Sequence, residues 1–146
     1  MNVKTVKELF QREEHLIRSI KRREERYAEL TAAATSAGSF RYDQEKVTGS
    51  MPDGSRQESI VIRMTITEAE LRENRRELGK IQQAIRMLTG KITLPRIRRL
   101  MKYRHVDHHT PEECMEHFGL SFDTYKDYHK RGLTIMQKNI DSIPKI

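Results

Sequence analysis

The 146-residue sequence has little of what a globular core is built from: it contains no tryptophan, few aromatic residues and only 36% hydrophobic residues. This composition excludes a thick apolar core, and the chain length excludes a large multidomain enzyme. The single cysteine, Cys114, excludes an intrachain disulfide framework and fits a reducing compartment. Because 34% of the residues are charged, we expect long helices with most of their surface in solvent.

Long hydrophobic runs and catalytic motifs are also missing. No apolar run approaches the roughly 20 residues that span a bilayer, and the first residues, M-N-V-K-T-V-K-E, lack the apolar core of a signal peptide. The sequence has no phosphate-binding glycine loop, nucleophile elbow or H-E-x-x-H motif. We therefore expect a cytoplasmic protein that is not an enzyme, binds no cofactor and contacts no membrane.

Positive charge is what the chain has in excess, with 28 Lys and Arg against 21 Asp and Glu. Such an excess favours an anionic partner, because cationic side chains release counterions from phosphates. It is concentrated in residues 91–109, where Asp107 is the only acid, whereas the other segments are nearly balanced. A solvated helix face is the alternative explanation of this run. Its basic residues are Lys91, Arg96, Arg98, Arg99, Lys102 and Arg104.

Two segments repeat mainly apolar residues at alternating steps of three and four, as in the seam of a coiled coil. They predict one helix from Val6 and a second from about Thr65 to Leu88. Neither helix has enough apolar surface to be stable alone, so we expect an antiparallel coiled-coil hairpin over residues 1–90. The seam residues are Val6, Leu9, Glu13, Leu16, Ile20, Arg23, Tyr27, Leu30 and Ala34 in the first segment, and Met64, Thr67, Leu71, Asn74, Leu78, Ile81, Ile85 and Leu88 in the second.

The connection between these helices, about residues 36–63, is rich in glycine, serine and aspartate and is typical of a long loop. Pro52 to Gly54 is a turn signal, and the alternation S-I-V-I-R-M at residues 59–64 allows a short strand. Because closure entropy grows slowly with loop length, a loop of this size still lets the two helices pair.

A third helix is predicted from Pro95 to about His105, after Gly90 closes the second helix. Its apolar residues recur on one face and its basic residues lie mostly on the other. The predicted buried stripe is Ile97, Leu100 and Met101, and the outer residues are Arg96, Arg99 and Lys102.

The segment from Thr110 to about Arg131 has the pattern of two short helices joined by a sharp turn. Thr110, in a T-x-x-E capping box, begins the first helix, and Gly119 supplies the positive φ that ends it. Ser121 caps the second helix. The pattern predicts a helix-turn-helix, for which an ordinary helical hairpin is the alternative. The small core is expected from Phe118, Leu120, Tyr125 and Tyr128.

The predicted fold class is therefore all-α. We expect a coiled-coil hairpin over residues 1–90, a three-helix helix-turn-helix module over residues 91–138 and a tail over residues 139–146.

The run Y-R-H-V-D-H-H-T-P-E-E-C-M-E-H-F-G-L-S-F-D-T-Y-K-D-Y-H-K-R-G-L resembles region four of bacterial sigma factors. More narrowly, it is similar to sigma-like phage regulators of the ArpU and RinA type. In that family an R-Y-containing helix precedes a short acidic linker, the pattern I-A-x-x-L-G-x-S and a recognition helix ending near H-R-R-A-L. The resemblance covers residues 96–133, and most of the chain in layout. The matching residues are Arg104, Glu112, Glu113, Phe118, Gly119, Ser121, Thr124, His129, Arg131 and Leu133.

Five residues depart from the family pattern. Pro111 replaces an aromatic residue, and Met115 replaces a small alanine between the helices. Gly132 replaces a helix-favouring residue, so we expect it to end or bend the recognition helix early. Asp123 and Asp127 turn negative charge toward DNA phosphate, although a carboxylate can accept a hydrogen bond from cytosine N4.

The resemblance implies a phage-encoded transcriptional regulator that acts in the bacterial host cytoplasm as an activator of late genes. The implied partners are double-stranded DNA and, through the coiled coil, either RNA polymerase or a second copy of the protein. The residues expected to bind DNA are Arg96, Arg99, Lys102, Ser121, Phe122, Asp123, Lys126, Asp127, Lys130 and Arg131.

Two other functions fit the same pattern. A phage packaging protein resembling a small terminase subunit also joins a helix-turn-helix to helical oligomerisation elements. An interaction protein would instead use the module against RNA polymerase or a host factor, and for it the acidic residues of the second helix would be an advantage.

Five of the six histidines lie between His105 and His129, and some of them, with Cys114, suggest a zinc site. Their spacing matches no standard zinc pattern, so we expect no bound metal. Cys114 is instead expected in the core, and His108 and His109 in a linker near phosphate.

Overall fold

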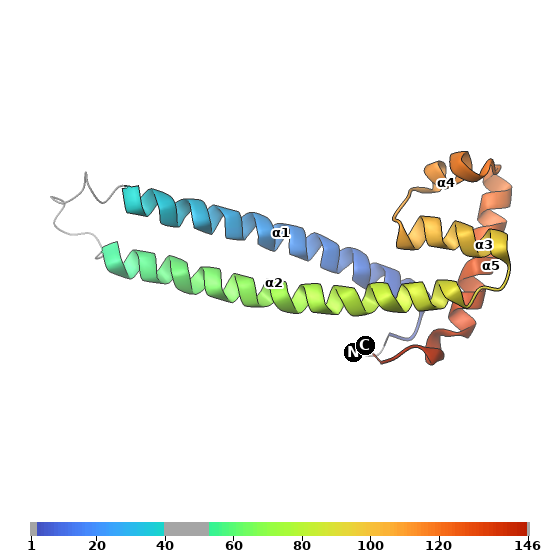
Figure 1. The fold of residues 1–146 in the computed structure, drawn as a ribbon, viewed down its shortest axis with the longest axis horizontal. Coiled ribbons are helices and arrows are strands. Elements are labelled where there is room, and N and C mark those ends of the chain that lie inside the picture. Colours follow the sequence, from blue (N-terminus) through green and yellow to red (C-terminus); the bar gives the residue numbers. More distant parts are fainter. Residues whose placement is uncertain (1–2, 40–52, 146) are drawn as a thin grey trace. The chain divides into compact units, whose positions relative to one another are not determined.

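The computed structural model describes residues 3–39 and 53–145, and every regular element in these ranges is helical, which confirms the predicted all-α class (Figure 1). No described helix combines the length and the apolarity needed to cross a membrane. The elements are α1 (Val6–Ser39), α2 (Asp53–Gly90), α3 (Pro95–Met101), the π-helical turn η2 (Lys102–Val106), α4 (Pro111–Phe118), α5 (Phe122–Lys138) and the 3-10 turn η3 (Ile140–Ser142).

The second helix begins at Asp53, twelve residues before the predicted start at Thr65. The short strand predicted at residues 59–64 is wrong, because these residues are helical. Residues 36–39 of the predicted loop are helical and belong to α1, and residues 40–52 lie outside the described residues.

A helical repeat explains this early start. Ile60 is 9% exposed and precedes buried Thr67 by seven residues, so the helical repeat of the second segment continues upstream of Met64. In the sequence the short alternation around Ile60 conceals that longer repeat. Packing therefore selects the helical period over the strand period.

Contacts divide the chain into two compact units. The central unit comprises His15–Arg76, and the terminal unit comprises Met1–Glu14 together with Glu77–Ile146. The boundary predicted at residue 90 therefore falls inside the terminal unit, because the last turns of α2 and the first turns of α1 pack with the C-terminal helices.

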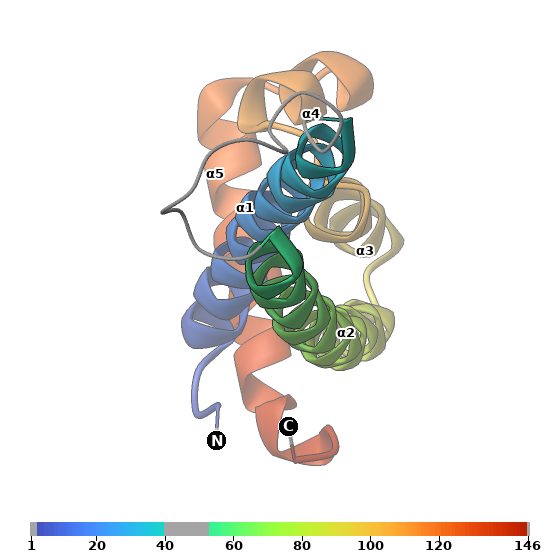
Figure 2. The same cartoon turned by 90° about the vertical axis from the view of Figure 1, so that its left-hand side faces the viewer.

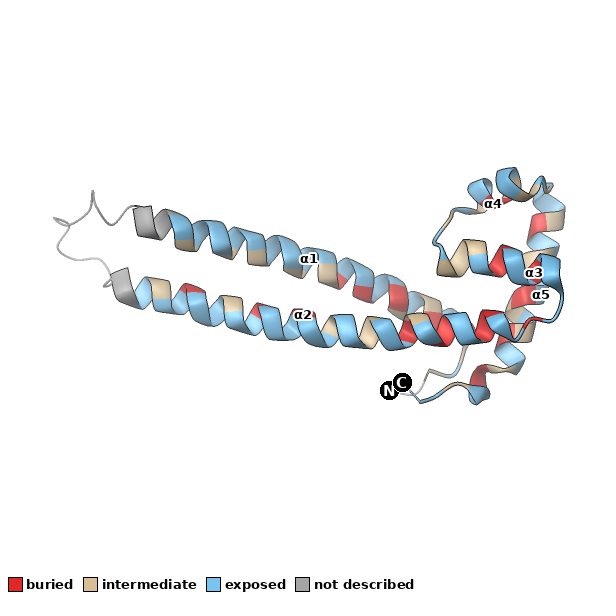
Figure 3. Ribbon diagram, viewed as in Figure 1, coloured by how far each residue is buried: buried red, intermediate tan, exposed pale blue. Residues whose placement is uncertain are grey.

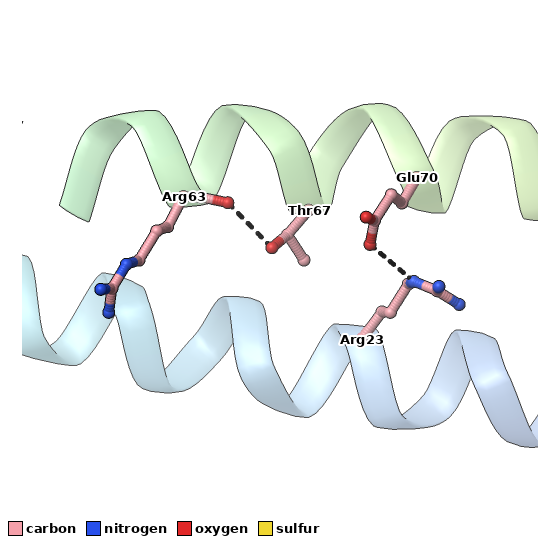
Figure 4. Close-up of polar contacts among 4 residues, drawn as sticks. All are labelled: Arg23, Arg63, Thr67 and Glu70. Carbon is pink, nitrogen blue, oxygen red and sulfur yellow. Dashed lines mark hydrogen bonds and ion pairs between the residues drawn. The ribbon is translucent and has the colours of Figure 1, made fainter. Parts of the chain in front are cut away.

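In the central unit α1 and α2 run antiparallel and lie side by side in both views (Figure 1 and Figure 2). Their contacts are partly polar: Arg23 Nε lies 2.8 Å from Glu70 Oε2, and Arg75 donates to Glu24 at 2.8 Å. The hydroxyl of buried Thr67 is satisfied within its own helix by a backbone carbonyl (Figure 4).

Burial along α1 and α2 follows the predicted seams, since every predicted seam position is buried or half-buried (Figure 3). The two charged seam positions have partners of their own: Glu13 faces His108 in the terminal unit, and Arg23 faces Glu70 in the central unit. A polar partner therefore accompanies each charged residue at a seam position.

The terminal unit has its own apolar core. Ile97, Leu100 and Met101 are buried on α3, as predicted. Leu100 packs with buried Cys114 of α4 and Tyr125 of α5, so the predicted core position of Cys114 is also confirmed. The half-buried residues around this cluster are Tyr103, Met115, Phe118, Leu120 and Tyr128.

The predicted early end of the helix at Gly132 is wrong, because α5 continues through this residue to Lys138. Gly132 is buried, and a Cβ at this position would lie 2.5 Å from Met101 Cγ. The missing side chain lets α5 approach α3 closely, so this glycine serves packing rather than the end of a helix.

Candidate nucleic-acid interface

The segment predicted to form two helices and a turn does so, with the caps and the turn at the predicted residues, while α5 extends past the predicted end near Arg131 to Lys138. Thr110 caps α4 by accepting a hydrogen bond from the Glu113 backbone N–H at 3.2 Å. Gly119 ends the helix with φ 62°, and the Leu120 N–H donates to the Met115 carbonyl at 2.9 Å. This backbone arrangement closes α4 in the left-handed conformation that glycine adopts without strain.

Ser121 then begins α5. Its hydroxyl oxygen accepts a hydrogen bond from the Thr124 backbone N–H at 3.3 Å, as the sequence predicts, and also lies 2.9 Å from the Thr124 hydroxyl. Only Gly119, Leu120 and Ser121 separate α4 from α5. The two caps fix where α5 starts and therefore which of its residues face solvent.

All of the residues predicted to bind DNA are exposed in the structure. They come from three elements: α3, η2, and α5 with its cap residue Ser121. Phe122 is notable because 64% of this large apolar side chain is exposed. The exposed residues are Arg96, Arg99, Lys102, Ser121, Phe122, Asp123, Lys126, Asp127, Lys130 and Arg131.

A groove joins α3 to the turn between α4 and α5. Its volume is about 480 Å³, and Arg96 and Arg99 line it together with Gly119 and Leu120 of the turn. The rest of the lining is Leu100, Phe118 and Tyr128. The structure thus brings two of the predicted phosphate-binding arginines beside the turn that precedes α5.

Charge on the outer face of α5 is partly internally paired. Arg131 Nε lies 3.2 Å from Asp127 Oδ2, one helical turn away, and both side chains are more than half exposed. Within the described residues, none of the cations of α3 and η2 takes part in an ion pair, and neither does Lys126 or Lys130 of α5. The exposed residues Arg96, Arg99, Lys102, Lys126 and Lys130 are therefore available to an anionic partner.

A histidine pair connects this surface to the rest of the terminal unit. His105 Nε2 of η2 lies 2.9 Å from His129 Nε2 of α5, and the His105 ring stacks on Phe10 of α1 at a centroid distance of 4.0 Å. Burial, followed by the neighbouring charges of His129 and Arg104, lowers the pKa of His105 to about 3. Burial also lowers the pKa of His129. The pair is therefore held neutral, with one ring donating to the other.

The other histidines of the linker also have protein partners. His108 Nε2 lies 2.8 Å from Glu13 Oε1, and Glu13 is only 7% exposed. His109 Nδ1 lies 2.6 Å from Glu113 Oε2, and this hydrogen bond is the main cause of a lowered pKa at Glu113. Among the described residues no group of three or more His, Cys, Asp or Glu could hold a metal ion.

Two features of this unit were missed by sequence reasoning: the docking of the start of α1 on the C-terminal helices, and the histidine pair. A charged residue at a seam position, Glu13, was the available signal for the first. The pairing of His105 with His129 has no sequence signal, because 24 residues separate them and α4 lies between.

Comparison with protein-family models, with curated proteins and with solved structures gave no match.

Proposed function

We propose that this chain is a DNA-binding transcriptional regulator of the sigma-like phage type, which recognises double-stranded DNA through a helix-turn-helix formed by α4 and α5. In this proposal α5 is the recognition helix. The role of the protein in the host cell would be activation of late genes, as the family resemblance of the C-terminal segment implies.

The observation that carries the proposal is a group of exposed cations around the turn that make no ion pair within the described residues. Arg96 and Arg99 of α3 line the groove beside Gly119 and Leu120, and α5 exposes Lys126 and Lys130 in its first half. A recognition helix that presents cations, with a neighbouring helix that presents cations beside the same turn, is suited to major-groove and backbone contacts at one site.

In the proposed complex the first half of α5 lies in the major groove. Lys126, Lys130 and Arg131 contact phosphates or base edges there, and Phe122, which is largely exposed, is suited to the methyl group of thymine. Because Asp127 is paired with Arg131, its charge repels phosphate less than a free carboxylate would.

The phosphate backbone is contacted from α3 and η2. Arg96, Arg99 and Lys102 are exposed on these elements, and phosphate contacts of this kind fix register without reading sequence. Asp123 at the start of α5 is the remaining acidic group of the proposed face, and it is suited to accept a hydrogen bond from cytosine N4.

The long helices α1 and α2 are proposed to act as a coiled-coil hairpin that recruits a partner. RNA polymerase or a second copy of the chain is the partner that the resemblance implies. Val61, Ile62 and Ile66 are apolar and more than half exposed on α2, and they give this hairpin an uncovered apolar surface.

Direct titration tests DNA binding. Labelled duplex DNA from the region upstream of the protein's own gene is titrated with the full chain at two salt concentrations and followed by fluorescence anisotropy. We expect tight binding at low salt that weakens steeply as salt rises. The double substitution Lys126→Ala and Lys130→Ala should weaken binding to every sequence.

A matched control uses two exposed cations of α2, Arg72 and Lys80, replaced by alanine. This variant loses the same net charge and should bind as the wild type does. No binding at low salt, or equal losses in the two double variants, would overturn the proposed role of α5.

A further inference from the structure

A second groove lies in the terminal unit between the start of α1 and the second half of α5. Its volume is about 510 Å³. From α1 it is lined by Val6, Lys7 and Phe10, and from α5 by Lys130, Leu133 and Lys138, among others. We call it the lysine-rimmed groove. Apart from Lys130, none of these residues belongs to the proposed DNA-binding surface.

The chemistry of this groove is an apolar floor with a cationic rim. Phe10 and Leu133 are half-buried, so part of each ring or side chain remains in contact with solvent. Lys7, Lys130 and Lys138 are exposed, and none of them takes part in an ion pair among the described residues. Among the residues that the structure describes, no aspartate or glutamate lines the groove.

Both ends of the groove are held in place by specific contacts. At one end the Val6 backbone N–H donates to Gln137 Oε1 at 2.9 Å, and Gln137 Nε2 donates to the Lys4 carbonyl at 3.2 Å. At the other end Phe10 stacks on His105, which is hydrogen-bonded to His129. A preformed groove avoids the entropic cost of ordering its walls when a ligand binds.

The length of the groove limits its occupant. Lys130 and Lys138 are eight residues apart on α5, which corresponds to about 12 Å along a helix axis. An amphipathic helix of a few turns places apolar residues along one face at this scale, and helix-in-groove recognition reads such anchors.

We propose that the lysine-rimmed groove docks a short amphipathic helix of a partner protein whose polar face is acidic. The apolar face of that helix covers Phe10 and Leu133, and its carboxylates meet Lys7, Lys130 and Lys138. A phosphate backbone would satisfy the lysines but would leave the apolar floor uncovered, so the chemistry favours a protein. The inference does not depend on DNA binding by the first half of α5.

The probe is a fluorescein-labelled synthetic peptide of about four helical turns, with leucine at positions i, i+3, i+4 and i+7 and glutamate on the opposite face. Two control peptides test the two halves of the proposal. One carries lysine in place of every glutamate, and the other carries serine in place of every leucine. Fluorescence anisotropy with the full chain should detect binding of the first peptide alone.

The variants are Lys7→Gln with Lys138→Gln, and Leu133→Ser. Each should weaken binding of the acidic peptide about three- to tenfold, in keeping with exposed charge pairs and one apolar contact. Lys21→Gln with Lys80→Gln removes two exposed lysines elsewhere and should leave peptide binding unchanged. Thermal midpoints identify any variant that fails to fold.

Several outcomes would overturn the proposal: no binding of the acidic peptide at low salt, equal binding of the serine peptide, or equal losses in the two lysine variants. An equal loss of DNA binding and of peptide binding in the variant with Lys7→Gln and Lys138→Gln, whose two lysines lie outside the proposed DNA-binding surface, would assign the groove to nucleic acid instead. Loss of protein dimers on adding peptide, measured by light scattering, would assign it to a second copy of the chain. DNA affinity measured in parallel separates failure here from failure of the proposed DNA-binding function.

Discussion

Gly132 of α5 lies against Met101 of α3 so closely that a Cβ on the glycine would be 2.5 Å from Met101 Cγ and 2.6 Å from its sulfur. Met101 has no exposed surface, so its side chain cannot simply swing out into solvent to make room. This contact sets the distance between the helix that carries Arg96 and Arg99 and the proposed recognition helix. Gly132 lowers the intrinsic helix propensity of α5, yet the packing of α5 against α3 requires it.

The substitution Gly132→Ala should destabilise the protein although alanine is the better helix former. Overpacking a core costs about 1–3 kcal/mol, and the gain in helix propensity offsets at most about 1 kcal/mol of that. Urea denaturation followed by the near-ultraviolet circular dichroism of the tyrosines measures the difference.

Gly79→Ala is the matched control for that measurement. Gly79 lies within α2, is exposed, and a Cβ there would meet nothing within 4 Å. This variant should be as stable as the wild type or stabilised by up to about 1 kcal/mol. A stabilised Gly132→Ala variant would mean that α3 and α5 do not pack as described.

Stability should fall as the solution becomes acidic, beginning near the ordinary histidine pKa of 6.5. Burial lowers the pKa of His105 to about 3 in the folded protein, so between these values the unfolded chain binds a proton that the folded chain does not. The contribution of neutral His105 to stability is complete above pH 6.5 and is lost progressively as the pH falls below that value. The loss should reach about 3 kcal/mol near pH 4.5.

The test of this pH effect is the slope of unfolding free energy against pH between 7.5 and 5. His105→Asn should flatten the slope whatever its effect on stability at neutral pH, because it removes the group that titrates. His15→Asn removes an exposed histidine of the central unit and serves as the control. An unchanged slope in the His105→Asn variant would contradict a neutral pair in the folded protein.

The cap of α4 should contribute measurably to the terminal unit. Replacing Thr110 with alanine leaves the Glu113 backbone N–H without its side-chain acceptor and should cost about 1 kcal/mol. Thr110→Ser keeps the hydroxyl and should restore most of that stability in the same denaturation experiment. Equal losses in both variants would mean that the hydroxyl does not cap the helix.

The size of the particle in solution discriminates between regulator and packaging protein. Multi-angle light scattering should give the mass of a monomer or dimer, because a regulator needs at most one copy for each half-site. A large closed ring would instead favour a packaging protein of the small-terminase kind and would count against the proposed function.

Local signals in the sequence were strong in the C-terminal segment. Thr110, Gly119 and Ser121 determine the helix boundaries through hydrogen bonds that a few neighbouring residues make, so their roles could be predicted without the fold. The burial of Leu100 and Tyr125 followed from helical spacing, and that of Cys114 from the family resemblance and the usual burial of a free cysteine.

The errors arose where distant residues decide the structure. Gly132 suggested an early end of the helix because its packing partner on α3 could not be known from helix propensity. Ile60 and its neighbours alternated like a strand, yet their burial depends on the partner helix. His105 and His129 meet only because the intervening chain reverses direction, which no local spacing reveals.

For the proposed interface, the sequence could predict that the DNA-binding candidates are exposed, but not which of them lie next to each other in the folded protein. Arg96 and Arg99 were expected on an outer helix face, and the structure adds that they share a groove with the turn before α5. The pairing of Arg131 with Asp127 follows a helical spacing that was present in the sequence.

The salt dependence of DNA binding tests the central claim most directly. The logarithm of the association constant is measured against the logarithm of salt concentration for the wild type and for Arg96→Ala with Arg99→Ala, on duplex DNA from the protein's own upstream region. If both arginines contact phosphates, the slope should become shallower by roughly 1.8, or about 0.9 for each lost contact. An unchanged slope would contradict the role of α3, and no binding by the wild type at low salt would contradict the whole proposal.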